Sequence, residues 1–183
     1  MQTSAKVRAL TFSGDGERVM VGLEDRTVRA LSVATGAEAA EFSGLSEPAA
    51  AIAASGNGRF VTAVTKKGEL CIWDARRNKR LHRLDLQVGV SAMRFLPDKA
   101  TLLLGCIDGA ILAIDVVGGR PLGRFEAHDA AVTDLAVSKD GSHLASVDAQ
   151  GQVTVWNRPS VSRRGQRAGA RATKKAKVSA VGS

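Results

Sequence analysis

The residues that most often carry out chemistry are few in this chain, and their spacing does not match a known site. The histidines His82, His128 and His143 lie far apart, and no pair has the spacing of metal ligands. The segments Gly14-Asp15-Gly16 and Gly56-Asn57-Gly58 connect strand-like segments and do not open helices, so they are not phosphate-binding loops. No serine stands in a nucleophile-elbow context. We therefore expect no metal, no cofactor, no small-molecule substrate and no enzymatic activity.

The two cysteines, Cys71 and Cys106, lie in apolar, strand-like segments. Because the chain has no dense cysteine framework, buried and reduced thiols are expected, which fits a reducing compartment. Residues 1–6 lack the apolar core of a signal peptide, and no apolar run approaches the roughly 18 residues that span a bilayer. The sequence predicts a nuclear or cytoplasmic protein without a membrane partner.

The formal net charge of +8 is concentrated at one end of the chain. Residues 1–157 carry 18 basic and 18 acidic side chains, whereas residues 158–183 carry eight basic and no acidic ones. This terminal segment is rich in Arg, Lys, Ala, Gly and Ser and has no aromatic residue. Such a composition buries too little apolar surface to offset the entropy of ordering. We predict a disordered basic tail over residues 158–183.

Two basic groups in this tail resemble a bipartite nuclear localisation signal. Their members are Arg163, Arg164, Lys174, Lys175 and Lys177. A solubilising extension and a polyanion-binding arm are the alternatives. Because no aromatic residue is available to stack on bases, any contact with nucleic acid would be weak and made to phosphates. The pattern slightly favours the nucleus over the cytoplasm.

A repeat organises the rest of the chain. Four matching strand-like segments end at residues 32, 74, 115 and 157, so the period is 41 or 42 residues. Each follows a second apolar segment, a turn pair such as Asn57-Gly58 or Asp140-Gly141, and a third apolar segment. Gly and Asn tolerate the left-handed conformation of tight turns. The pattern predicts short antiparallel strands, four in each unit.

The segment that ends each match is apolar on both of its faces. In the second repeat, Leu70 and Ile72 alternate with Cys71 and Trp73. A sheet that is apolar on both faces must be covered on both. Consecutive repeats are therefore expected to stack sheet against sheet.

An aromatic–acidic pair closes this segment in the second repeat, Trp73-Asp74, and a related pair, Trp156-Asn157, closes it in the fourth. With a period near 41 residues and four strands per unit, the chain resembles the WD40 family. The resemblance implies an all-β fold of WD40-like propeller blades over residues 7–157, after a lead at residues 1–6. The repeats cover about 7–44, 45–87, 88–128 and 129–157.

The resemblance also implies which residues maintain the repeat. These structural positions are Trp73, Asp74, Asp115, His128, Ser146 and Trp156. The fourth repeat matches three members of the family's His–Ser–Asp–Trp hydrogen-bond network, with Gln150 where the Asp is expected. On this view no repeat has the full network, so the blades should depend more on packing.

The number of strands leaves ring closure open. Three repeats have four expected strands, whereas the fourth has no outer strand before residue 158. Propellers close with about 4–8 blades. The chain could be part of a larger propeller, complete a ring with another chain or a second copy, or close alone as a four-bladed ring.

The family resemblance implies a non-catalytic protein–protein interaction scaffold that is a subunit of a larger assembly. Binding in this family uses turns at one end of the blades, which makes Glu24, Asp25, Lys66, Lys67, Asp108 and Gln150 candidate contacts. The alternative is a nuclear factor in RNA or ribosome assembly that contacts phosphates through its basic tail.

Overall fold

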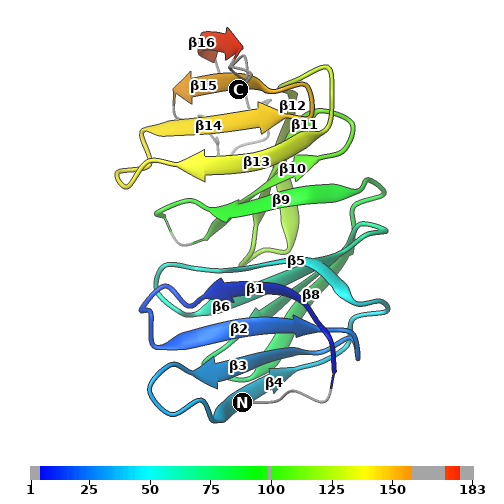
Figure 1. Cartoon of the computed structure of the whole chain (residues 1–183), viewed down its shortest axis with the longest axis vertical. Helices are drawn as coiled ribbons and strands as arrows, with labels where there is room; N and C mark the ends of the chain where they lie inside the picture. The colour runs from blue at the N-terminus through cyan, green and yellow to red at the C-terminus, as the bar shows by residue number, and fades with distance from the viewer. Residues whose placement is uncertain (1–4, 99, 158–171, 178–183) are drawn as a thin grey trace, which may run out of the picture. The chain divides into compact units, whose positions relative to one another are not determined.

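The computed structural model describes residues 5–98 and 100–157 and the backbone of residues 172–177 (Figure 1). Over these residues the chain is all-β, with sixteen strands in four antiparallel sheets. In each sheet the strands that pair are neighbours in sequence order. The predicted fold class is confirmed.

The strand bounds follow the repeat. Sheet one contains β1 (Val7–Phe12), β2 (Arg18–Leu23), β3 (Val28–Ser32) and β4 (Glu38–Phe42). Sheet two contains β5 (Ala49–Ala54), β6 (Phe60–Thr65), β7 (Glu69–Asp74) and β8 (Lys79–Asp85). Sheet three contains β9 (Val90–Phe95), β10 (Thr101–Cys106), β11 (Ala110–Asp115) and β12 (Arg120–Glu126). Sheet four contains β13 (Val132–Val137), β14 (His143–Asp148), β15 (Gln152–Asn157) and β16 (Ala172–Lys177).

The four sheets divide between two compact units. The first unit contains sheets one and two together with residues 116–119, and the second contains sheets three and four from Ser91 onward. Each unit therefore contains one pair of stacked sheets.

In the first unit, apolar side chains of sheet one pack against those of sheet two. Met20 and Ala30 share a buried cluster with Ile52, Val61 and Trp73. The contact is close because sheet one presents a glycine there: a Cβ on Gly22 would lie 3.1 Å from the Ala49 Cβ. Burial of this apolar surface drives the stacking.

The second unit repeats this arrangement with sheets three and four. Leu103 and Ile111 share a buried cluster with Leu135, Leu144 and Trp156. Gly105 takes the place of Gly22, since a Cβ there would lie only 2.7 Å from Val132 Cγ1. Equivalent apolar positions of the repeat thus form the core of both units.

The turns between the second and third strands share one backbone feature. Gly68, Gly109 and Gly151 have positive φ at the same repeat position, and Arg26, with φ 69°, occupies it in sheet one. Gly109 also cannot carry a side chain, because a Cβ there would lie 2.1 Å from the carbonyl oxygen of His128. This turn is therefore fixed against the segment that enters sheet four.

Sheet four departs from the expectation at its outer position. Its outer strand is β16, which pairs antiparallel with β15 although it belongs to the segment expected to be disordered. The prediction rested on composition, which indicates how much apolar surface a segment can bury. Pairing with an edge strand such as β15 instead uses its free backbone N–H and C=O groups, which any extended segment can meet. The remainder of the predicted tail, including Arg163 and Arg164, lies outside the described residues, as do residues 1–4 of the lead.

Candidate interaction face

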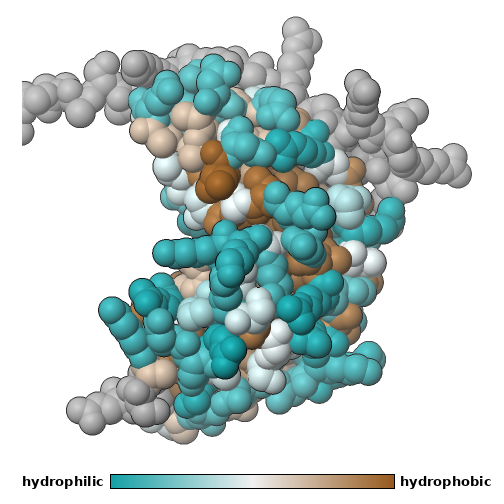
Figure 2. All heavy atoms as spheres, turned by 90° about the vertical axis from the view of Figure 1, so that its right-hand side faces the viewer, coloured by the Kyte–Doolittle hydropathy of each residue, from teal (hydrophilic) through white to brown (hydrophobic). Residues whose placement is uncertain are grey.

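The six candidate contact residues lie on four equivalent turns, each between the second and third strands of its sheet. Glu24 and Asp25 follow β2, Lys66 and Lys67 follow β6, Asp108 follows β10, and Gln150 follows β14. All six are exposed. In Figure 1 the β2–β3 turn lies at the right-hand end of its sheet, so Figure 2 looks onto this end, where hydrophilic side chains predominate. We call these four turns, two in each unit, the turn face, because they occupy the same position in the repeat.

The two acidic residues of the first turn are paired within their own sheet. Glu24 accepts hydrogen bonds from the Arg8 guanidinium, with Oε1 2.9 Å from Nη2. Asp25 accepts the backbone N–H and the hydroxyl of Thr27, at 3.0 and 2.6 Å, and lies 3.2 Å from Arg29. The Thr27 hydroxyl lowers the pKa of Asp25, and the Arg8 hydrogen bond lowers the pKa of Glu24. Both side chains are ionised anchors of the turn near neutral pH.

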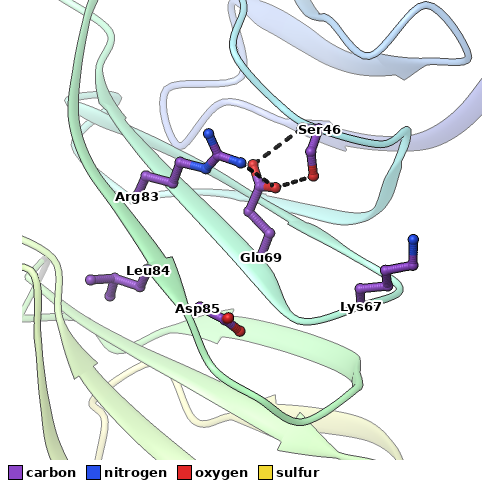
Figure 3. A pocket seen from close by; sticks show the side chains of 6 residues that line it. All are labelled: Ser46, Lys67, Glu69, Arg83, Leu84 and Asp85. Atoms are coloured by element: carbon purple, nitrogen blue, oxygen red, sulfur yellow. Dashed lines mark hydrogen bonds and ion pairs between the residues drawn. The ribbon is translucent and has the colours of Figure 1, made fainter.

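A polar hollow of about 340 Å³ opens beside the second turn (Figure 3). Its lining residues are Ser46, Lys67, Glu69, Arg83, Leu84 and Asp85. Glu69 is held at one side by the Ser46 backbone N–H and hydroxyl and by Arg83 Nη2 at 3.0 Å. Burial raises the pKa of Glu69, but the Ser46 and Arg83 contacts outweigh it and leave the pKa lowered. The hollow thus combines two cationic with two anionic side chains.

The two lysines of the second turn differ in their surroundings. Lys67 forms an ion pair with Glu47, and its side chain is 81% exposed. Figure 3 shows it directed away from the Glu69–Arg83 pair. Lys66 is exposed and has no acidic partner among the described residues. Both ammonium groups are therefore accessible from solvent.

The remaining two residues of the turn face also have local partners. Asp108 accepts a hydrogen bond from Arg124 Nη2 at 2.8 Å and one from the Ala110 backbone N–H at 3.2 Å. Burial raises the pKa of Asp108, yet these bonds outweigh burial and lower it. The backbone N–H of Gln150 donates to Asp148 Oδ1 at 2.9 Å. The turns are thus held by their own sheets before any partner binds.

Sheet four contains a buried chain of polar side chains beneath its turn. The indole Nε1–H of Trp156 donates to Ser146 Oγ at 2.8 Å, and Ser146 Oγ lies 2.7 Å from His128 Nε2. His128 Nδ1 lies 3.2 Å from Asp148 Oδ2. Because the indole only donates, the Ser146 oxygen is the acceptor of the Trp156 hydrogen bond, and it lies at the same time within hydrogen-bond distance of His128. The other ring nitrogen of His128 lies on the Asp148 side of the ring.

Asp148 is the member of this network that the sequence interpretation missed. The interpretation gave the acidic position to Gln150, two residues later, and concluded that no repeat has the complete set; sheet four has it. Asp148 is buried at the end of β14, where its Oδ1 accepts the backbone N–H groups of Gln150 and Gln152, each at 2.9 Å. An acidic residue just before the turn Ala149-Gln150-Gly151 was the available signal.

The residue types Ser146, His128 and Asp148 are those of a hydrolytic triad, but their setting gives them another role. Residue exposures are 2% for Ser146, 7% for His128 and 3% for Asp148. The serine oxygen also accepts the Trp156 hydrogen bond, so no substrate carbonyl can approach it. A triad nucleophile needs an accessible oxygen. The arrangement instead connects the entry segment, β14 and β15 of sheet four.

Sheet two is also connected to the segment that enters it, but without such a network of side chains. The Trp73 Nε1–H donates to the backbone carbonyl of Ser43 at 3.2 Å. Asp74, which is 2% exposed, accepts the backbone N–H groups of Arg76 and Arg77 and lies 3.3 Å from Arg59 Nε. In sheet three, Asp115 lies 3.6 Å from Arg120 Nε. The aromatic–acidic pair therefore fixes both the segment before a sheet and the turn after its third strand.

The two cysteines are buried and unpaired by disulfide. Burial raises the pKa of each thiol to about 12. Neither thiol is therefore ionised near neutral pH, so neither serves as a nucleophile there. Within the described residues no helix could cross a membrane, and no cluster of His, Cys, Asp and Glu could hold a metal ion.

The family model that matches the chain is the WD domain, G-beta repeat, over residues 2–30 and 119–157. The chain is similar to the WD40-repeat family over these two segments. Its four sheets are like WD40 blades and match part of larger WD40 structures. We refer to sheets one to four as blades one to four from here on.

Individual matches cover most of this chain but only part of the other proteins. WD repeat-containing protein 55 of Arabidopsis thaliana is 23% identical over 82% of this chain and 43% of its own length. U3 small nucleolar RNA-associated protein 12 of Saccharomyces cerevisiae is 28% identical over 52% of this chain and 10% of its own length. The solved structure of U3-55K superposes with a TM-score of 0.76 at 19% identity, over 88% of this chain and 52% of that one. Homologues include subunits of protein complexes, and no enzyme is named among them.

Proposed function

We propose that this WD40-like protein is a non-catalytic scaffold that binds other proteins through its turn face, as a subunit of a larger assembly. The observation that carries the proposal is the charged hollow beside Lys67. Its two cations and two anions suit a charged peptide segment better than an apolar small molecule, which prefers a mostly apolar cavity. The turns are already fixed by Asp25, Asp108 and Asp148, so little ordering is lost when a partner binds.

The test is co-purification of the tagged full-length chain with mass spectrometry, repeated with Lys66→Glu/Lys67→Glu. We expect partners captured by the wild type to be depleted at least several-fold by this variant, because charge reversal disrupts the electrostatic complementarity with a charged segment. Lys139→Glu is the matched control, since Lys139 is also an exposed lysine in a turn, outside the turn face. Equal capture by all three proteins would contradict the proposed face.

A second candidate function, a nuclear factor that contacts RNA phosphates, is supported by the β7–β8 turn as well as by the tail. Arg76, Arg77 and Lys79 are exposed and have no acidic partner among the described residues. Asp74 and Arg59 place a further guanidinium at the same end of the blade, since Arg59 Nε lies 3.3 Å from Asp74. The name of the yeast relative refers to association with an RNA. The predicted localisation signal in the tail belongs to this proposal.

Salt dependence separates this function from scaffolding. For single-stranded RNA, the logarithm of the binding constant falls against the logarithm of salt concentration by about 0.7 per neutralised phosphate. Arg76→Gln/Arg77→Gln/Lys79→Gln should therefore reduce the slope by about 2 in a fluorescence-anisotropy titration. Lys139→Gln is the control and should leave the slope unchanged. An unchanged slope in the triple variant would restrict RNA contact to the tail, and no binding by the wild type would reject this function.

A further inference from the structure

The inner strand of blade one presents apolar side chains to solvent. Leu10 is 66% exposed, Phe12 is 59% exposed and Val7 is 43% exposed. All three occupy positions that are apolar in every one of the four repeats. We call them the β1 face.

The equivalent side chains of blade two are covered because a blade precedes it in the same unit. Ala49 and Ile52, the counterparts of Val7 and Leu10, are 1% and 8% exposed and share a cluster with Met20 and Ala30 of blade one. Gly22 brings the two backbones close at this contact. The β1 face therefore has the chemistry and register of a surface that packs on another blade.

The second unit shows the same contact independently. Val132 and Leu135, the counterparts of Val7 and Leu10 in blade four, are 0% and 1% exposed. They pack against blade three, where they share a cluster with Leu103 and Ile111. Two separate examples in one chain thus define what covers this column, namely the face formed by the second and third strands of a blade.

Blade four carries such a face with its apolar residues only partly covered. Met20, Val28 and Ala30 of blade one, which face blade two, are at most 1% exposed. Their counterparts in blade four, Ala145 and Val153 among them, are only half-buried. We call this surface of β14 and β15 the β14–β15 face.

We propose that the β1 face of one copy of the chain packs on the β14–β15 face of a second copy, repeating the contact between neighbouring blades. The large side chains Leu10 and Phe12 would meet small or β-branched residues, as Ala49 and Ile52 meet Gly22 within the first unit. A two-fold pair uses both faces of both copies, so neither apolar face is left open. It contains eight blades, within the range at which propellers close. The chain aligns with 52% of the U3-55K structure, so two copies also match the size of that solved chain.

The test is sedimentation velocity of the full-length chain over a concentration series. The wild type should be a dimer, and Leu10→Lys/Phe12→Lys should raise the dimer Kd on the order of tenfold or more, since lysine cannot be buried unpaired there. Val33→Lys is the matched control, because Val33 is 53% exposed but lies in the β3–β4 turn, away from both faces. It should leave the dimer unchanged.

Mixing identifies the two faces as partners. Val153→Lys should also weaken the dimer, but an equimolar mixture of Val153→Lys with Leu10→Lys/Phe12→Lys contains one undamaged contact per pair and should associate more strongly than either variant alone. Circular dichroism of each variant shows that it is folded, and Leu10→Ser/Phe12→Ser replaces the double lysine variant if that one is not. A monomeric wild type at every concentration, a dimer indifferent to these changes, or a mixture without recovery would each overturn the proposal.

Discussion

Replacing Trp73 by alanine is expected to lower the free energy of unfolding by about 3–5 kcal/mol. The side chain is 2% exposed and lies in the cluster where blades one and two meet. Its ring packs at 6.0 Å from the ring of Phe42, and its indole N–H fixes the Ser43 carbonyl at 3.2 Å. Alanine removes the ring from both blades and leaves a cavity, so the loss is a large part of a typical stability of about 5–15 kcal/mol. Chemical denaturation followed by circular dichroism measures it.

Trp73→Phe is the matched control for this variant. It keeps an aromatic ring beside Phe42 and removes the indole N–H, leaving the Ser43 carbonyl without that donor. We expect a cost of about 1–2 kcal/mol, well below that of alanine. If the alanine variant unfolds like the wild type, Trp73 does not anchor the core and the assigned strand register is wrong.

The strands could be predicted because each corresponds to a set of equivalent apolar positions in the repeat. The strands β3, β7, β11 and β15 end at residues 32, 74, 115 and 157, where the matching segments read from the sequence also end. Four copies reinforce one another, so a weak member such as Leu31-Ser32 is placed by the stronger ones. The strand that contains Ile72 and Cys71 is apolar on both of its faces, which predicted stacked sheets. Both side chains are fully buried.

Asp148 was missed for a reason that the repeat itself supplies. Its counterparts in the first three blades are Leu23, Thr65 and Cys106, which end their second strands as core residues. A repeat position that holds core residues in three blades predicts a strand there and does not indicate a polar network in the fourth. Which residue a buried carboxylate reaches depends on the path of the following turn, and column alignment does not contain that information.

The strand β16 illustrates a different limit. Its pairing with β15 uses backbone groups, which every residue carries, so composition gives no signal for it. The exposed β1 face was not assigned from the sequence, which predicted only that consecutive sheets stack on one another. The structure shows Leu10 and Phe12 exposed, whereas Ile52 and Leu135 are buried. This difference depends on which blades are in contact, and the sequence does not contain that information.

Replacing Asp148 by alanine is expected to lower the free energy of unfolding by about 2–4 kcal/mol. The carboxylate lies 3.2 Å from His128 Nδ1 and accepts two part-buried backbone N–H groups of the turn, so alanine removes the acceptor of both N–H groups and the charge beside His128. Asp148→Asn keeps an oxygen for the backbone groups but removes the charge, and its cost should be smaller. Gln150→Ala changes an exposed side chain and should stay within about 0.5 kcal/mol of the wild type.

The contribution of Asp148 should also depend on pH in a defined direction. Burial raises the pKa of this carboxyl, but the two backbone hydrogen bonds and His128 outweigh burial, so its pKa in the folded protein is lowered. A group with a lowered folded pKa contributes its full stabilisation above its unfolded value, about 3.9, and loses it as pH falls through the folded value. The difference in stability between the wild type and Asp148→Ala should therefore shrink from about pH 4 downward in acid denaturation. A difference that instead grew as the pH fell through this window would mean that the carboxyl is held protonated, and that His128 and the turn are ordered by something other than its charge.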